Sequence, residues 1–281
     1  MGDPSDLALR ARRLVLSLAG CDLGPYKDNL LLRHLRALAR KAGFADAQVY
    51  LDHLEQAGPG AAAPAAQLAR GASVQVSGFF RDPEVFAALE ALAYPELFGS
   101  ATGDTLRVWC AACARGQEAY SLAISLERFA RTRGLAQRVA VLGTDVDEGA
   151  LAAARAGVYG PRYVEELPAP LREEAFERAG PGAWRVRPQV RRLVRFRKAD
   201  LLDPRTHPTG MDLVSCRNLL IYLRRPVQEE LILGLRRALR PGGYLVLGAS
   251  ETALGRPWGL LEHVSPAHRI YRRPREDSDT A

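Results

Sequence analysis

The chain has 281 residues, of which 47% are hydrophobic and 25% are charged, and these are ordinary values for a globular protein. No apolar run approaches the roughly 18 residues that a membrane-spanning helix needs, so we expect no direct insertion into a membrane. The formal net charge of +7 favours acidic partners, which include both nucleic acid and acidic protein helices.

One segment near the start imitates a targeting signal. Residues 10–21 combine basic residues, a short apolar run and a Leu-Ala-Gly-Cys ending. The apolar run is shorter than the roughly 7 to 15 residues of a signal core, and Asp3 and Asp6 precede it. We therefore predict an amphipathic helix that is stopped by Gly20, in a protein that is not secreted.

The four cysteines do not form a disulfide framework in a chain of this size, and they favour the reducing cytoplasm. Cys110 and Cys113 have the C-x-x-C spacing found in zinc and redox sites. No second pair and no spaced histidines complete a tetrahedral site, so we interpret both as small apolar side chains and predict no metal.

Amphipathic stretches at residues 7–18, 29–42 and 47–56 open the chain, and glycines lie near their ends. They predict a small helical domain over residues 1–66. The second stretch places leucines on one face and a basic stripe, Arg33, Arg36 and Arg40, on another. This stripe is either a solvated face or a docking surface for an acidic helix, and the sequence leaves both open.

A low-complexity stretch, residues 58–66, is rich in Pro, Gly and Ala and predicts a linker to the next domain. Farther along, Asp82 and Pro83 mark the start of a helix. The two phenylalanines before them are most simply core residues. Arg81 between these features is either a surface ion-pair former or an anion clamp.

A strand, a turn and a helix follow one another over residues 107–129. An apolar run ends in a small-residue turn at residues 113–116, and apolar residues at helical spacing come next. Such a turn places backbone N–H groups and the positive end of a helix dipole at the carboxyl edge of a sheet. It lacks G-x-G-x-x-G and carries an acid, Glu118, so a dinucleotide fits poorly and a positively charged nucleoside is the first candidate ligand.

Strands and helices then alternate, which predicts a doubly wound α/β fold with a mostly parallel sheet over residues 67–281. A strand at 139–144 ends at Asp145, where a carboxylate in such folds binds a ribose diol; a solvated acid or a helix cap is the alternative. The other expected elements are strands at 211–215, 244–248 and 269–272 and a helix at 226–239 that is stopped by Pro-Gly-Gly.

Residues 157–197 interrupt this alternation. A Gly-Pro-Gly turn lies between strand-like stretches that are rich in arginine, which predicts a small inserted β-subdomain. Its charged face could hold phosphates, as in a nucleic-acid binder, or could simply be solvated.

At this point the chain resembles the chemotaxis receptor methyltransferases of the CheR type, a family of Rossmann-like S-adenosylmethionine (SAM) enzymes. The first matching segment lies in the helical domain, and the others follow in the family's order. They read GCDLGPYKDNLLLRHLRALARKAG, VSGFFRDPEVF, VWCAACARGQEAYSLA, LGTDVDEGALAAARAGVY, FRKADLLD, DLVSCRNLLIYL and PGGYLVLGASET.

The resemblance implies SAM as cofactor, S-adenosylhomocysteine as product, and methyl esterification of glutamate side chains on the cytoplasmic helical region of membrane chemoreceptors. The helical domain and the inserted subdomain would contact the receptor, and we expect a cytoplasmic monomer. Tyr222 matches a tyrosine beside the transferring methyl group, and Arg81 could fix a carboxylate. The positions that match cofactor contacts are Gln75, Ser77, Arg81, Glu118, Asp145, Asp200, Leu201, Arg217 and Asn218.

Two other functions stay open. The first is a SAM- or S-adenosylhomocysteine-binding sensor or scaffold of a chemosensory pathway with weak or no catalytic activity. The second is a nucleic-acid methyltransferase, which the net charge permits; the amide-methylating motif N-P-P-[YF] is missing from the sequence, so we expect no nucleic acid as partner.

Overall fold

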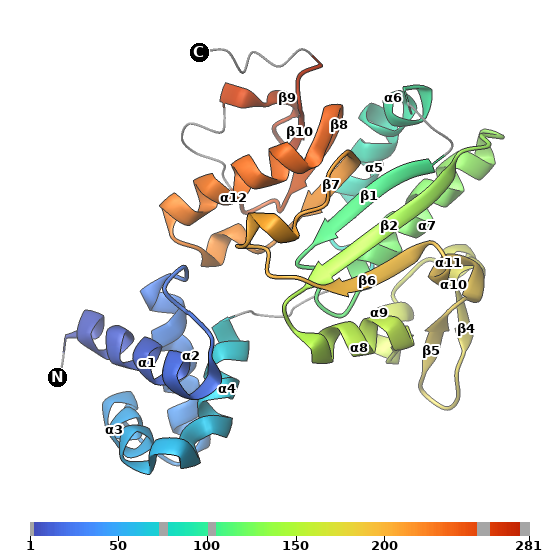
Figure 1. The fold of residues 1–281 in the computed structure, drawn as a ribbon. Coiled ribbons are helices and arrows are strands. Elements are labelled where there is room, and N and C mark those ends of the chain that lie inside the picture. The colour runs from blue at the N-terminus through green and yellow to red at the C-terminus, as the bar shows by residue number, and fades with distance from the viewer. Residues whose placement is uncertain (1–2, 73–77, 101–104, 252–258, 276–281) are drawn as a thin grey trace. The chain divides into compact units, whose positions relative to one another are not determined.

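The computed structural model describes residues 3–72, 78–100, 105–251 and 259–275. The chain forms two compact units, each treated by itself below (Figure 1). The first comprises residues 1–74 together with 219–228, and the second comprises residues 75–218 and 229–281. None of the helices in the described ranges is long and apolar enough to cross a membrane.

The first unit is helical, as predicted. Its core is formed by apolar side chains that all of its long helices contribute, among them Leu14, Leu35, Leu51 and Leu68. Its elements are α1 (Pro4–Ala19), α2 (Asp28–Lys41), α3 (Ala47–Ala57), the 3₁₀ helix η1 (Gly58–Ala61) and α4 (Ala62–Ala72). Helix α1 ends at Gly20 in the left-handed conformation, which confirms the predicted stop.

The prediction of a linker at residues 58–66 is wrong. This stretch forms η1 and the first half of α4; Ala61 belongs to the same core, and Ala65 is also fully buried. Alanine has the highest intrinsic helix propensity, and its small side chain lets helices approach closely. An alanine-rich composition therefore fits a tightly packed helix as well as it fits a flexible connection.

Residues 219–228 join the first unit through backbone hydrogen bonds, although they lie far away in the sequence. The Lys27 N–H donates to the Tyr222 carbonyl at 3.0 Å, and the Arg224 N–H donates to the Pro25 carbonyl at 2.9 Å. The Lys27 ammonium donates to the Ile221 carbonyl at 2.8 Å. The segment that carries Tyr222 is thus fixed to the start of α2.

The second unit is built on a seven-stranded sheet, and its order among the described residues is β6-β2-β1-β7-β8-β10-β9 (Figure 1). The parallel strands are β1 (Thr105–Ala111), β2 (Arg138–Asp145), β6 (Val194–Lys198), β7 (Met211–Cys216) and β8 (Leu239–Leu247). The antiparallel strands are β9 (Glu262–Ser265) and β10 (Ile270–Arg272). This arrangement confirms the doubly wound fold, whose order reverses between β1 and β7.

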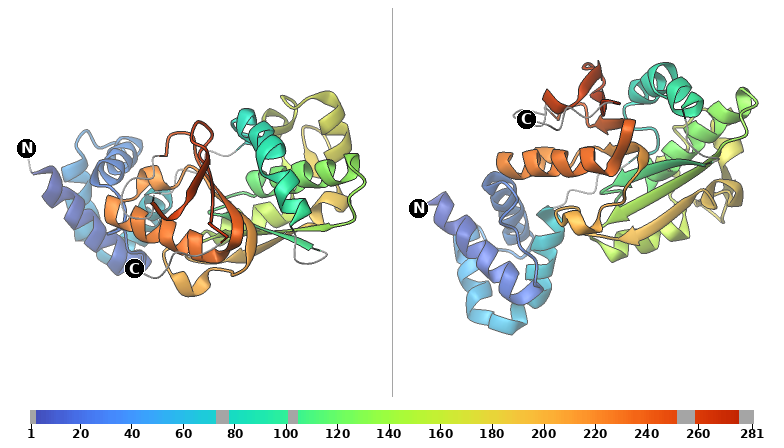
Figure 2. Two further views of the ribbon diagram at one scale, coloured as in Figure 1. Left: turned by 90° about the horizontal axis from the view of Figure 1, so that it is seen from above. Right: turned by 45° about the horizontal axis from the view of Figure 1, so that its top comes forward.

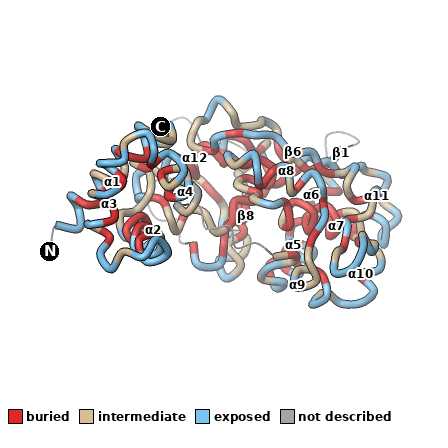
Figure 3. The backbone as a smooth tube through the Cα atoms, turned by 90° about the horizontal axis from the view of Figure 1, so that it is seen from below, coloured by how far each residue is buried: buried red, intermediate tan, exposed pale blue. Residues whose placement is uncertain are grey.

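Helices pack against this sheet and bury its faces (Figure 2). Alternate residues of β1 share one core with α5 (Pro83–Leu92), α6 (Tyr94–Gly99) and α7 (Gln117–Thr132). These β1 residues are Leu106, Val108 and Cys110. All six residues of β7 are buried, as expected for a central parallel strand, and the tube of Figure 3 shows buried backbone along β8 as well. Two further helices are α8 (Glu148–Ala156) and α12 (Arg225–Ala238).

The inserted region contains a small three-stranded antiparallel sheet, which confirms a β-subdomain. The last part of the predicted insertion, residues 194–197, instead belongs to β6 (Val194–Lys198), the edge strand of the main sheet. Alternating arginines and apolar residues fit either sheet, so the pattern could not decide its partner. The small elements here are β3 (Val158–Tyr159), β4 (Phe176–Arg178), β5 (Trp184–Val186), α9 (Pro161–Val164), α10 (Ala169–Ala175) and α11 (Pro188–Arg191).

We predicted that Pro241, Gly242 and Gly243 stop a helix and that the next strand begins at residue 244. Helix α12 does end before them, but β8 already begins at Leu239 and runs through all three residues. The pairing between β7 and β8 shifts register at this point. A Cβ atom on Gly243 would lie 2.9 Å from the Met211 carbonyl oxygen, so only glycine fits against the neighbouring strand. The bulge absorbs residues that would otherwise end a strand.

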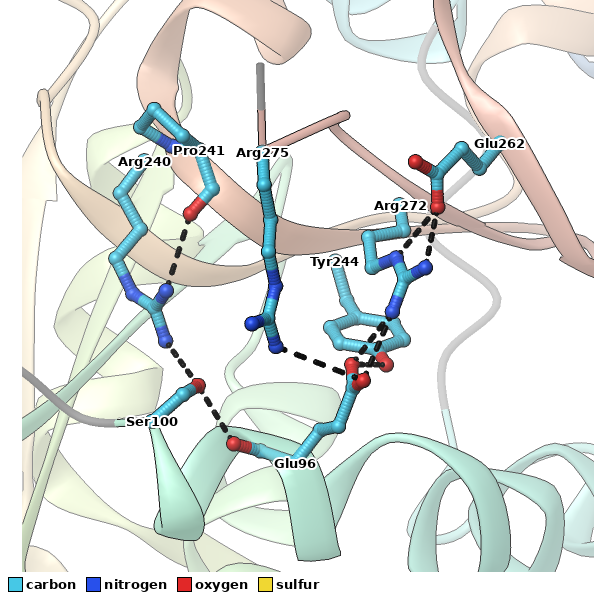
Figure 4. A network of polar contacts seen from close by, with 8 residues as sticks. All are labelled: Glu96, Ser100, Arg240, Pro241, Tyr244, Glu262, Arg272 and Arg275. Carbon is cyan, nitrogen blue, oxygen red and sulfur yellow. Dashed lines mark hydrogen bonds and ion pairs between the residues drawn. The ribbon is translucent and has the colours of Figure 1, made fainter.

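A network of polar contacts around Glu96 ties α6 to the antiparallel end of the sheet (Figure 4). The Tyr244 hydroxyl donates to Glu96 at 2.5 Å, and the Arg272 guanidinium donates to both Glu96 oxygens at 2.8 and 2.9 Å. Arg272 also pairs with Glu262 of β9. These partners lower the pKa of the Glu96 carboxyl, because they stabilise its charged form.

Candidate functional site

The parallel strands of the second unit all end at one edge of the sheet. In the ladders, Ala111 lies opposite Thr144, Asp145 opposite Lys198, and Cys216 opposite Leu247. Residues just after these positions come together, although they are far apart in the sequence. In doubly wound folds this edge, at the reversal of strand order, is where ligands bind.

The turn after β1 is tightly wound. Ala112, Ala114 and Gly116 all have positive φ, at 53°, 47° and 87°. A Cβ atom on Gly116 would lie 2.8 Å from the Ala154 Cβ and 2.9 Å from the Phe196 ring, so this position needs glycine for both conformation and space. The turn thus directs the first residues of α7, which begins at Gln117, to the ligand edge.

Asp145, at the end of β2, is 7% exposed and holds this turn in place. Its carboxylate accepts the Ala114 N–H at 2.8 Å and the Asp147 N–H at 2.9 Å. Burial raises the pKa of Asp145, and the backbone donors oppose that rise. Each oxygen retains a further lone pair, so the side chain can still accept the hydroxyl groups of a ribose.

Glu118 lies at the centre of a polar cluster. Its carboxylate accepts the Ser215 hydroxyl at 2.7 Å and pairs with the Arg217 guanidinium at 3.6 Å. The buried Arg217 side chain also donates to the Asp82 carboxylate at 2.7 Å and to the Arg81 carbonyl at 2.8 Å. The cluster therefore connects α7, the end of β7 and the segment before α5.

Arg81 is exposed and lies in a strained stretch of backbone. Phe80 and Asp82 on either side both have positive φ, at 49° and 55°, which is uncommon for residues with a side chain. The Phe80 N–H donates to the Ser121 hydroxyl of α7 at 2.9 Å. The contacts of the two neighbours fix the backbone at Arg81, and such strain is typical of functional positions.

Asp200 and Leu201 follow β6 at the same edge. The Asp200 side chain accepts the Leu202 N–H at 2.9 Å, so it stabilises its own turn and stays exposed. Asn218, after β7, adopts a positive φ of 62°. Its backbone nitrogen would lie 2.8 Å from a Cβ atom placed on Gly248 at the end of β8, so the two strand ends approach closely.

The structure brings together most of the predicted site residues that it describes. Tyr222 belongs to the first unit, in the 3₁₀ helix η3 (Leu220–Tyr222), and it is half-buried there. Gln75 and Ser77 lie outside the described residues. The described positions of the second unit that meet at the sheet edge are Arg81, Glu118, Asp145, Asp200, Leu201, Arg217 and Asn218.

Sequence reasoning missed three residues of this edge. Ser215 donates to Glu118, Asp82 pairs with Arg217, and Glu251 accepts the Gly248 N–H at 2.5 Å. Asp82 looked like a helix cap, but its side chain makes no cap hydrogen bond. A polar residue at the end of a buried strand was the available signal for Ser215.

Burial is the main reason why the pKa of the Cys113 thiol is raised, and the negative charges of Asp145 and Glu118 raise it further. The thiol stays protonated at neutral pH, so it is a poor nucleophile and a poor metal ligand. This agrees with the interpretation of Cys110 and Cys113 as small buried side chains.

The chemistry of the site fits SAM. One carboxylate at the end of β2, Asp145, and one in the first turn of α7, Glu118, suit a ribose diol and a cationic sulfur, and they would repel a dinucleotide phosphate. Within the described residues, two buried polar atoms here have no hydrogen-bond partner: Gln117 Oε1 and Arg217 Nε. Unpaired buried polar atoms are costly, so they favour a polar ligand at this edge.

Comparison with known proteins agrees with this chemistry. Residues 75–262 match the family model described as CheR methyltransferase, SAM binding domain, and residues 9–64 match CheR methyltransferase, all-alpha domain. Chemotaxis protein methyltransferase 1 of Pseudomonas aeruginosa is 40% identical over 176 residues, which cover 62% of this chain and 64% of that protein. The match thus spans less than two thirds of this relative.

A longer alignment is found with the chemotaxis protein methyltransferase of Listeria monocytogenes. It is 34% identical over 242 residues, which cover 86% of this chain and 88% of that protein. The similarity therefore extends over both the helical unit and the sheet.

Proposed function

The chain belongs to the CheR methyltransferase family, and we propose that it transfers a methyl group from SAM to glutamate side chains of chemoreceptors. The observation that carries this proposal is the cluster of Glu118, Asp145 and Arg217 at the point where the strand order reverses. That place and those charges suit a cationic nucleoside.

Within this proposal, Asp145 holds the ribose hydroxyl groups and Glu118 faces the positive part of the cofactor. Ser215 and Arg217 both contact the Glu118 carboxylate, and these two contacts fix its orientation. Arg81 binds a carboxylate, either the cofactor's own or that of the substrate. Asp200, Leu201 and Asn218 complete the wall of the pocket, and Gln75 and Ser77 are proposed from the family resemblance.

The proposed reaction needs little acid–base catalysis from the protein. A sulfonium methyl group is already activated for transfer when SAM is bound. A glutamate carboxylate has a reference pKa near 4.3, so it is already a nucleophile at neutral pH and needs no general base. The chain must hold the carboxylate in line with the methyl group and exclude water, and such positioning supplies most of the rate gain.

Arg81 and Tyr222 are the proposed catalytic residues, and Tyr222 orients the attacking oxygen with a hydrogen bond. Within the first unit it lines a small hollow together with Lys27, Asn29, Leu30, Arg33 and Ile221. The backbone hydrogen bond between Lys27 and Tyr222 fixes this hollow to α2. A cationic side chain beside the tyrosine supports the approach of an acidic substrate.

The proposed partner is the acidic, glutamate-bearing helical region of a chemoreceptor on the cytoplasmic side. Arg33, Arg36 and Arg40 are all exposed on α2, as the predicted stripe requires, and they are the proposed docking surface. The small β-subdomain, which contains β3, β4 and β5, is the proposed second receptor contact. We propose a cytoplasmic enzyme that acts as a monomer.

Transfer of a labelled methyl group from SAM to a purified receptor fragment, as a base-labile ester, tests the function. Tyr222→Phe should keep cofactor affinity and turn over slowly, because the hydroxyl is lost and the ring remains. Tyr50→Phe is the matched control, since this tyrosine is buried in the same unit. Equal turnover of both variants contradicts the catalytic role of Tyr222.

Calorimetry with S-adenosylhomocysteine separates the remaining outcomes. Binding together with ester formation supports the methyltransferase. Micromolar binding without transfer to any receptor supports the sensor or scaffold function instead. A chain that binds neither SAM nor its demethylated product at millimolar concentration contradicts the whole proposal.

A further inference from the structure

A second basic cluster lies in the second unit, apart from the residues assigned to the cofactor. Four arginines line one surface hollow: Arg155 of α8, Arg191 and Arg192 at the end of α11, and Arg195 of β6. Tyr120, Pro188, Val194 and Phe196 form the rest of its lining. None of these residues is assigned to the cofactor or to the methyl transfer step, and three of the arginines lie in the stretch 157–197 that the family resemblance assigns to receptor contact.

Little negative charge balances this cluster. Arg155 pairs with Glu148 at 2.5 Å and also donates to the Phe196 carbonyl at 3.3 Å. Arg191 donates to the Arg155 carbonyl at 3.2 Å. Among the described residues, no ion pair of Arg192 or Arg195 is found within 4 Å. Like charges gathered this closely repel one another, so the hollow favours an anion.

The local hydrogen bonds also hold two of the guanidinium groups in place. Arg155 and Arg191 are both fixed to backbone carbonyls, so less side-chain entropy is lost when they bind a ligand. Arg192 and Arg195 are exposed and can turn toward an incoming group. Guanidinium groups bind phosphate oxygens in pairs of hydrogen bonds, which lysines cannot match.

The aromatic part of the lining favours a ligand that carries a ring as well as phosphate over inorganic phosphate alone. Phe196 is half-buried, and its ring packs on the backbone at Gly116 and Gly143. It also contacts Tyr120 with ring centroids 5.5 Å apart. A ring that is held in this way and lines a hollow together with arginines offers an apolar surface for a flat heterocycle.

We propose that this hollow binds a nucleotide, with its phosphates on Arg192 and Arg195 and its base against Phe196. The residues of the hollow are not among those proposed to hold the cofactor, although the Phe196 ring packs beside Gly116 in the turn before α7. A small phosphorylated ligand fits better than an extended acidic surface, because the cluster is confined to a hollow with an aromatic side chain in its lining.

The test is a calorimetric titration of GDP into the full chain at 150 mM salt, with S-adenosylhomocysteine at saturation so that the cofactor edge is filled. We expect saturable micromolar binding. The double variant Arg192→Gln/Arg195→Gln should weaken it by about tenfold or more, because two charge-assisted contacts are lost. Arg185→Gln/Arg237→Gln removes two exposed arginines outside the hollow, so it should bind as the wild type does.

Further ligands show whether the hollow recognises a nucleotide, a free phosphate group or an acidic polymer. Inorganic pyrophosphate should compete with GDP more weakly than unlabelled GDP does, and guanosine alone should not bind. Equal affinity for pyrophosphate and GDP would overturn the nucleotide class. No GDP binding at millimolar concentration, or equal binding by the two double variants, would overturn the site. Retention of single-stranded RNA or of poly-glutamate without GDP binding would also overturn it, in favour of a macromolecular surface.

Discussion

Replacing Gly116 by alanine probes the turn on which the candidate site depends. At φ 87° an alanine is strained, which costs about 1 to 2 kcal/mol. The new Cβ would lie 2.8 Å from the Ala154 Cβ and 2.9 Å from the Phe196 ring. Overpacking of this kind adds about 1 to 3 kcal/mol. We therefore expect Gly116→Ala to lower the free energy of unfolding by about 2 to 5 kcal/mol.

Gly134→Ala is the matched control. Gly134 also has a positive φ, of 64°, but no atom lies within 4 Å of its added Cβ. It should show only the backbone cost of about 1 to 2 kcal/mol. Urea unfolding of both variants, followed by the fluorescence of the buried Trp109 in β1, measures the difference.

The same variant should bind S-adenosylhomocysteine more weakly, because the turn that positions Glu118 has moved. Gly134→Ala should keep the wild-type affinity. If Gly116→Ala is no less stable than Gly134→Ala, then Phe196 and Ala154 do not restrict this turn and the reasoning fails.

Two further predictions concern the rest of the fold. Ala65→Asp should destabilise the first unit by more than about 2 kcal/mol, because it buries an unpaired charge. Ala63→Asp, on the exposed side of α4, is the control and should change the stability little. Circular dichroism on heating compares the two variants, and equal tolerance of both would indicate a linker instead of a packed helix. Glu96→Gln should cost less than about 1 kcal/mol at pH 7, since the carboxyl is partly exposed. Because the folded-state pKa of Glu96 is lowered, its contribution is present above the ordinary glutamate pKa of about 4.3 and is lost as pH falls through the lower folded value. The difference between wild type and Glu96→Gln in urea unfolding should therefore shrink toward pH 3, and a difference that grows in acid would refute this sign.

The candidate site could be predicted from the sequence where local pattern and chain direction suffice. The apolar run before Glu118 had to be a strand, and the helical spacing after it had to be a helix, so the turn between them had to lie at a sheet edge. Asp145 followed a second such run and reached the same edge for the same reason. Arg217 lay after a third. The partners of Arg217 could not be predicted, because Asp82 and Glu118 are 135 and 99 residues away from it in the sequence.

Sequence alone determined the alternation of strands and helices, the helical first unit and the acids at the strand ends, because these follow from hydrophobic period and chain order. Only the tertiary structure decided that residues 58–66 are helical, that residues 194–198 belong to the main sheet, and that Pro-Gly-Gly continues a strand through a bulge. In each case the local pattern fitted two structures about equally well. The choice between them depended on which distant surface the segment could bury, and that surface exists only once the chain has folded.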